Sequence, residues 1–380
     1  MVYLCLALFV YVCFALKNNK IIKTTLGNEI IVPAKEKEQK ISWLAVVVLI
    51  LFSGLRAHSV GGDISTYRIA FNEIGFAHSV ENGYVHYEPF YKILNWATTL
   101  FGPTDTAFSV FLLIISIINV VLVVYVAKTI SSDIALTMFL FVCVDIFIPS
   151  LSLLRQAIAI SFIILSLKYV YEKKPLKFII CVIVAYFFHD SALLMLVLYL
   201  FNLLKNNKHN YYYYGFGFII LIVFAIFDEE IILRLCNALG FNYYWWYSMG
   251  GDKLSLLSHL KAISVVMVCG FFIAYKIYRD KKGKPLGKKY NLFLNIYYVA
   301  ALLNIYNMIA GTLGIVSRML YYFSWVLMLL VPEFLISIEN KKWKKIFTIL
   351  MIVAGICYLS TTVVLRDQFI VNPYKTIFQV

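Results

Sequence analysis

The sequence has little charge and lacks the signature motifs of several enzyme classes. Only 14% of its 380 residues are charged, whereas 62% are hydrophobic; a soluble domain is roughly 45–50% apolar. It contains no P-loop, no DxD motif, and no GxSxG, HExxH or Cys-His signature. These absences argue against an ATP-driven pump, a transferase that holds a nucleotide sugar on a metal ion, and the corresponding hydrolases. The apolar excess indicates a protein whose surface faces lipid.

Metal-binding and disulfide patterns are missing as well. The seven cysteines include no CxxC pair, and all except Cys236 lie within apolar runs. His58, His78 and His86 share one loop, but their spacing matches no metal motif. We therefore expect neither a disulfide framework nor a metal site.

Long apolar runs predict an all-α, polytopic integral membrane protein that forms a single transmembrane domain over residues 1–380. The first sixteen residues have neither a positive leading segment nor a small-residue cleavage site, so we expect a span there rather than a signal peptide. Because a span needs roughly 17–25 mostly apolar residues, we predict about ten spans. They lie approximately at residues 1–16, 41–56, 106–127, 134–150, 154–171, 211–227, 259–278, 290–310, 319–338 and 346–365.

One apolar segment does not fit a single crossing. Residues 178–204 are interrupted at His189 and Asp190, and lysines flank the segment on both sides. A single crossing would place one lysine-rich end outside, so we expect a re-entrant pair of half-helices with His189 at or near the tip. The large outer loops of this topology cover approximately residues 56–105 and 228–258.

The basic residues set the orientation. The net charge is +14, and 24 of the 34 lysines and arginines fall in the predicted inner loops, as the positive-inside rule requires. The charge therefore reflects topology, and we expect no nucleic-acid partner. Six of the seven arginines, in contrast, fall on the outer side. Topology needs only charge, whereas arginine binds phosphate bidentately, so the outer face is predicted to bind an anion. The alternative is chance together with snorkelling at span ends.

Two arginines stand at the outer starts of spans. Arg155 opens one span, and Arg318 opens another, with Tyr321 and Tyr322 one turn later. An arginine near hydrocarbon is tolerated when a ligand or a partner residue neutralises its charge. We expect an anionic ligand at Arg155; the alternative is an ion pair within the protein, for which Asp145 is a candidate.

Two acids and one histidine are candidates for proton transfer. Asp63 follows two glycines, which allow a tight turn that presents its carboxylate, and Glu88 precedes a proline. Both are candidate general bases, against the alternative of ordinary solvated acids. His189 interrupts an apolar segment, where it either moves a proton or binds a ligand, or is a hydrogen-bonded core histidine.

Seven short motifs follow one another along the chain: Gly54-Leu-Arg56, Gly62-Asp-Ile-Ser-Thr-Tyr67, Tyr87-Glu-Pro89, Leu154-Arg-Gln-Ala-Ile-Ala159, Phe188-His-Asp-Ser191, Arg318 and Asn372-Pro-Tyr374. In this order they resemble the EpsG family, a branch of the Wzy-type polysaccharide polymerases. The resemblance covers nearly the whole chain, although no motif is specific by itself.

The resemblance implies a metal-independent membrane glycosyltransferase that uses no cofactor. Such polymerases join oligosaccharide repeat units, carried on polyprenyl pyrophosphate, on the outer face of the bacterial cytoplasmic membrane, and their product is O-antigen, capsule or exopolysaccharide. A chain-length regulator and a flippase are the further partners that the resemblance suggests.

The expected site combines cations for the leaving pyrophosphate with a base for the acceptor hydroxyl. The expected catalytic residues are Asp63, Glu88 and His189. The expected pyrophosphate-binding residues are Arg56, Arg155, Gln156 and Arg318. The expected sugar-binding aromatics are Tyr67, Trp245 and Trp246, the last two in a run that could also be an interfacial belt.

Three other functions compete with polymerisation, although no motif supports the third, a membrane acyltransferase. A ligase that moves finished glycan to another acceptor uses the same donor chemistry, and the sequence leaves it open. A flippase or transporter of the same lipid-linked sugar needs comparable groups on both faces, whereas the inner loops here are short and rich in lysine. The large outer loops favour a reaction site that faces outward.

Overall fold

The computed structural model is helical in the part of the chain that it describes. That part comprises residues 1–18, 39–77, 87–202, 211–227, 238, 255–310, 314–365, 367 and 369–379, and it contains no β-strand. The predicted all-α class is therefore confirmed. Most of the second outer loop, with Trp245 and Trp246, lies outside the described residues.

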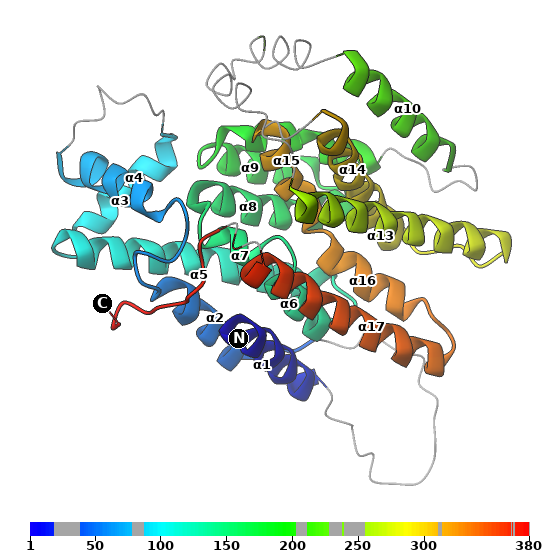
Figure 1. Cartoon of the computed structure of the whole chain (residues 1–380), viewed down its shortest axis with the longest axis horizontal. Helices are drawn as coiled ribbons and strands as arrows, with labels where there is room; N and C mark the ends of the chain where they lie inside the picture. Colours follow the sequence, from blue (N-terminus) through cyan, green and yellow to red (C-terminus); the bar gives the residue numbers. More distant parts are fainter. Residues whose placement is uncertain are drawn as a thin grey trace, which may run out of the picture.

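The long helices follow the predicted apolar runs, whereas two short helices, at residues 64–72 and 89–99, fall within the predicted outer loop (Figure 1). The first half contains α1 (Val2–Asn18), α2 (Trp43–Gly54), α3 (Ile64–Asn72), the π-helical turn η1 (Glu73–Ala77), α4 (Pro89–Thr99), α5 (Thr104–Ile130), α6 (Ile134–Cys143), α7 (Phe147–Ser150) and α8 (Leu154–Tyr171). The second half contains α9 (Pro175–Tyr186), the 3₁₀ helix η3 (Asp190–Asn202), α10 (Tyr211–Phe227), α13 (Leu256–Lys281), α14 (Lys288–Ala310), α15 (Gly314–Ser324), α16 (Leu327–Ile336), α17 (Lys341–Ser360) and the π-helical turn η5 (Thr361–Leu365).

Six helices are long and apolar enough to cross a membrane. They are Thr104–Ile130, Leu154–Tyr171, Leu256–Lys281, Lys288–Ile309, Val316–Ile336 and Lys341–Leu365. Each coincides with a predicted span, and the polytopic membrane character follows from them. Several other apolar helices, among them α1, α2 and α6, have only 10–17 residues, so the predicted total of about ten crossings stays a prediction.

The predicted span at 134–150 is divided. Asp133 caps α6, because its carboxylate accepts a hydrogen bond from the Leu136 N–H at 3.1 Å. All residues of α6 are buried, with α1, α16 and α17 packed around it. The helix ends at Cys143, and α7 begins four residues later. The break contains Asp145, whose buried carboxylate pairs with Lys261 of α13 at 2.8 Å.

The two ends of the helical bundle differ in chemistry. The short helices α3 and α4 lie beside the start of α5 at one end, and the C-terminus reaches the same end (Figure 1). The turns from α13 to α14 and from α16 to α17 lie at the opposite end (Figure 1), and they carry many of the lysines assigned to the inner side. This separation is what the positive-inside rule requires of a membrane protein.

The segment at 178–204 forms two short helices that pack against each other. Helix α9 has 12 residues and η3 has 13, and the turn between them contains His189. At 1.5 Å per residue, α9 is about 18 Å long, which is shorter than a hydrocarbon core of about 30 Å. Both helices also pack on α8. This hairpin is compatible with the re-entrant topology, which stays a prediction.

We predict that both ends of the α9–η3 hairpin face the cytoplasm. Reporter domains fused after Lys174 and after Lys208 should both read as cytoplasmic, because lysines flank the hairpin on each side. A fusion after Gly102, in the first outer loop, is the control and should read as external. Opposite readings from the two hairpin fusions would contradict the re-entrant topology.

Candidate active site

Glu88 joins three segments that are far apart in the sequence. It precedes α4, and only 2% of its surface is exposed. One carboxylate oxygen, Oε2, accepts a hydrogen bond from Arg155 Nη1 at 2.8 Å. The other, Oε1, lies 3.0 Å from His189 Nδ1 and accepts a longer bond of 3.4 Å from the Asp190 N–H. The start of α4, the start of α8 and the tip of the α9–η3 hairpin therefore meet at one carboxylate.

The bond to Glu88 sets the tautomer of His189. Burial raises the pKa of Glu88, but the His189 hydrogen bond and the Arg155 charge outweigh burial, so the pKa lies below its ordinary value. An ionised carboxylate only accepts hydrogen bonds, so Nδ1 must carry the proton. In the neutral imidazole, the other ring nitrogen, Nε2, then has a lone pair. It is buried and has no hydrogen-bond partner among the described residues.

Arg155 lies in a shell of aromatic rings. Its guanidinium carbon is 5.0 Å from the centroid of the Tyr87 ring and 5.8 Å from that of Tyr91, and its side chain also hydrogen-bonds Tyr67. Aromatic faces stabilise a cation where water is excluded. The next residue, Gln156, donates to the Arg318 carbonyl at 2.7 Å. This bond connects α8 to α15 and brings the second arginine to the same region.

Asp63 is presented by a turn that requires glycine. Gly61 has a φ of +119°, and a Cβ there would lie 2.3 Å from the Leu151 carbonyl oxygen. The N–H groups of Gly61 and Gly62 donate to carbonyls of the C-terminal segment at 3.0 and 2.7 Å. The Asp63 N–H donates to Ser152 Oγ at 3.1 Å. The turn is thus fixed from both sides, and the Asp63 carboxylate is left half-buried.

The surroundings of Asp63 combine burial with positive charge. Burial raises the pKa of its carboxyl above the ordinary value, and the charges of Arg318 and Arg155 oppose that shift only in part. Since both arginines act on Asp63, the turn lies within electrostatic range of the Glu88 cluster.

Arg56 is part of the protein interior. It is 2% exposed, and its guanidinium donates to three backbone carbonyls: those of Val60 at 3.2 Å, Leu151 at 3.1 Å, and Ser53. A buried guanidinium that donates to three backbone carbonyls stabilises the fold, and its donors are not available to a ligand. The geometry therefore argues against the expected contact between Arg56 and pyrophosphate.

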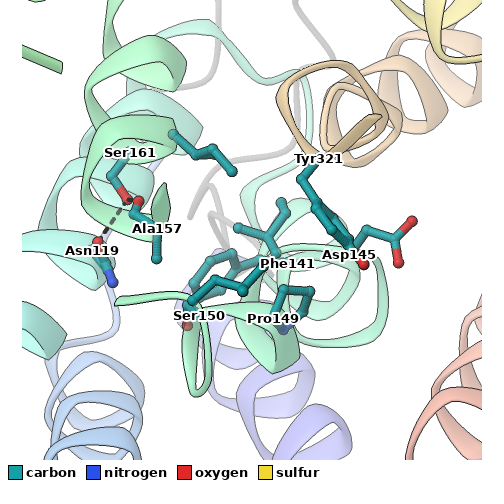
Figure 2. A pocket seen from close by; sticks show the side chains of 11 residues that line it. Asn119, Phe141, Asp145, Pro149, Ser150, Ala157, Ser161 and Tyr321 are labelled. Carbon is teal, nitrogen blue, oxygen red and sulfur yellow. Dashed lines mark hydrogen bonds between the residues drawn. The ribbon is translucent and has the colours of Figure 1, made fainter. Parts of the chain in front are cut away.

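Asp145 is not the partner of Arg155. The alternative of an ion pair within the protein is confirmed for Arg155, but its partner is Glu88, and Asp145 pairs with Lys261 instead. Figure 2 shows Asp145 beside a small cavity between α5, α6 and α8, where Ser161 Oγ donates to Asn119 Oδ1 at 3.0 Å. The cavity measures about 10 Å³, which holds about one water molecule. It is too small for a sugar.

Most of the expected site residues come together. The clustered residues are Asp63, Tyr67, Glu88, Arg155, Gln156, His189 and Arg318. Trp245 and Trp246 lie outside the described residues. Sequence reasoning missed Tyr91 and Ser152; the second tyrosine, four residues after Tyr87, was the available signal for the first. Within the described ranges, no group of three or more His, Cys, Asp or Glu is placed to hold a metal ion.

Comparison with known proteins identifies the family. The model of the EpsG family matches residues 41–376, which is most of the chain. The chain therefore belongs to the EpsG family, and the resemblance found in the sequence is confirmed. No curated protein and no solved structure matches the chain.

We predict that Arg56 stabilises the fold. Replacing it by Met in Arg56→Met leaves three buried carbonyls without their donor, which should cost about 3 kcal/mol or more. The readout is the unfolding temperature of the detergent-purified protein. Arg68→Met is the matched control: the Arg68 side chain is 41% exposed and pairs with the exposed Asp105, so its loss should matter little. Unchanged stability of Arg56→Met together with lost glycan transfer would return Arg56 to the substrate-binding set.

Proposed function

We propose that this protein polymerises oligosaccharide repeat units carried on polyprenyl pyrophosphate, at the outer face of the bacterial cytoplasmic membrane. The family membership supports a role in polysaccharide synthesis. The observation that carries the proposal is the cluster of Arg155, Glu88 and His189, to which Asp63 and Arg318 lie close. The cluster belongs to the end of the bundle with α3 and α4, away from the lysine-rich turns (Figure 1).

His189 is the proposed general base. The acceptor hydroxyl attacks the anomeric carbon of the donor sugar, and its proton passes to Nε2 as the new C–O bond forms. The bond from the anomeric carbon to the pyrophosphate oxygen breaks, and the pyrophosphate leaves with the electron pair. Glu88 touches neither substrate in this scheme. It is a positioning residue, which holds Nδ1–H and stabilises the imidazolium that forms, as carboxylates do beside catalytic histidines.

Arg155 and Arg318 are the proposed contacts for the pyrophosphate. Charge develops on the leaving oxygen in the transition state, and fixed guanidinium groups stabilise it without reorganisation. Gln156 aligns the two arginines through its bond to the Arg318 carbonyl. Its own side-chain oxygen is buried and lacks a partner among the described residues, so it can accept a hydrogen bond from a substrate hydroxyl.

Asp63 and Tyr67 are the proposed contacts for the acceptor sugar. Asp63 is half-buried and stands at the start of α3, one turn before Tyr67. A carboxylate binds sugar hydroxyls strongly when water is partly excluded. In this scheme Asp63 orients the acceptor, and His189 removes its proton.

The roles of His189 and Asp63 predict different losses of activity. In a transfer assay with purified protein and lipid-linked repeat units, His189→Gln should lower the rate by about a hundredfold or more, because an amide cannot take the proton. Asp63→Asn keeps a hydrogen-bonding oxygen and should lose only about tenfold, mainly through the acceptor KM. The reverse order would make Asp63 the base. Full activity of both variants would contradict the proposed site.

If the planar guanidinium groups of Arg155 and Arg318 each bind the pyrophosphate bidentately, lysine should be a poor substitute for either. Arg155→Lys and Arg318→Lys keep the charge but not the bidentate geometry, so each should lose roughly a hundredfold or more in transfer rate. The alanine variants should be at least as impaired. Arg68→Lys and Arg68→Ala, on the same predicted face, are the controls and should retain activity. Full activity of the lysine variants would show that charge alone suffices, and full activity of Arg155→Ala would show that Arg155 only pairs with Glu88.

A further inference from the structure

A second cleft lies at the lysine-rich end of the bundle. It is formed by α13, α16 and α17, near the turns that connect α13 to α14 and α16 to α17 (Figure 1). Its volume is about 570 Å³, within the range of roughly 300–1,000 Å³ that is typical of ligand sites. Few residues of α13 and α17 are buried, only 22% in the most apolar stretch of each, so the cleft is open to the surrounding membrane.

The walls of the cleft are aromatic. Phe334 of α16 packs against Phe271 of α13 and Phe347 of α17, with both centroid distances at 5.4 Å. The ring centroid of Tyr275 lies 4.9 Å from that of Phe334, and the ring centroid of Trp343 lies 6.2 Å from that of Phe347. A soluble anion gains nothing from such walls, whereas acyl chains are stabilised by contact with them.

The rim of the cleft is basic. Arg279, Lys282 and Lys284 line it, with Glu339 as the opposing carboxylate. Glu339 lies 2.7 Å from Lys284 Nζ and 3.5 Å from Arg279 Nη1. Within the part of the chain that the structure describes, no carboxylate pairs with Lys282. The lining residues therefore keep a net positive charge.

The first turn of α17 adds further positive charge beside the cleft. It consists of Lys341, Lys342, Trp343, Lys344 and Lys345, all of which are exposed. A tryptophan among lysines at the end of an apolar helix is typical of the membrane–water interface. The rim therefore lies at headgroup depth, and the aromatic walls lie at the depth of the acyl chains.

We propose that this cleft binds an anionic glycerophospholipid of the inner leaflet. The phosphate contacts Lys282 and Lys284 at the rim, and an acyl chain lies along Phe271, Phe334 and Phe347. Basic pockets between transmembrane helices on the cytoplasmic side recognise anionic headgroups by this combination of charge and apolar contact. The bound lipid connects α13 to α17 and so fixes two exposed helices that otherwise share few contacts. This inference does not depend on the proposed glycan chemistry.

The test is a lipid titration of the full-length protein in neutral detergent, read by native mass spectrometry. The probes are phosphatidylglycerol and phosphatidylcholine with identical acyl chains. The wild-type protein should bind phosphatidylglycerol at least fivefold more tightly, and Lys282→Gln/Lys284→Gln should lose roughly tenfold in that affinity. Glu339→Gln should bind more tightly than wild type, because it removes the opposing carboxylate, and high salt should weaken binding in every case.

The matched control is Lys173→Gln/Lys174→Gln, in the turn between α8 and α9. It also removes two lysines from the same predicted face, one of which pairs with a carboxylate, since Lys174 Nζ lies 2.6 Å from Glu172. This variant should keep the wild-type preference. Equal binding of the two lipids by the wild-type protein, or equal losses in both double variants, would overturn the proposal. Preferential binding of polyprenyl phosphate over phosphatidylglycerol would overturn the assignment to a phospholipid.

Discussion

The arrangement of the candidate site depends on one buried carboxylate. Glu88 accepts hydrogen bonds from Arg155 and His189 on its two oxygens, and each donor comes from a different helical unit. Breaking a buried pair by removing one partner costs about 3–5 kcal/mol, because the remaining charge stays buried and unpaired. Glu88 and its two donors therefore fix the relative positions of α4, α8 and the α9–η3 hairpin. The hydrogen bond from His189 to Glu88 also orients the imidazole, so Glu88 serves both the packing of the helices and the proposed chemistry.

Two of the described arginines, Arg56 and Arg279, act as multiple hydrogen-bond donors. Arg56 donates to three carbonyls near the end of the bundle with α3 and α4, and Arg279 donates to the carbonyls of Lys284 and Ser337 at the opposite end. Lysines, in contrast, crowd the exposed turns, where charge alone is needed. The predicted outer set of arginines thus includes Arg56, which stabilises a loop without helical hydrogen bonds, and only Arg155 and Arg318 stay in the proposal for an anionic substrate.

The length of the apolar runs was sufficient to predict the long helices, because a lipid-facing span needs such a run whatever its neighbours are. The short helices α3 and α4, inside the predicted outer loop, were not predicted. The order of short motifs likewise brought Asp63, Glu88, Arg155 and His189 into one hypothesis. The sequence did not reveal which charged residues form ion pairs with one another. Asp145 is ten residues from Arg155 but pairs with Lys261, more than a hundred residues away, and nothing in the local pattern distinguishes the two choices. The burial of Arg56 was hidden for the same reason, since its partners are backbone carbonyls that any residue could supply.

The first and last motifs of the chain are parts of one structural unit, which explains why they occur together. The C-terminal segment 369–377 runs beside residues 55–62, with hydrogen bonds from Ala57 N to the Lys375 carbonyl at 2.9 Å and from Ile377 N to the Leu55 carbonyl at 3.0 Å. Tyr374 stacks on Phe52 at 4.1 Å, and its hydroxyl donates to the Phe52 carbonyl at 2.7 Å. Backbone outside a helix needs such partners wherever water is scarce. By satisfying the N–H groups just before Asp63, the last residues of the chain fix the turn that presents this carboxylate to the site.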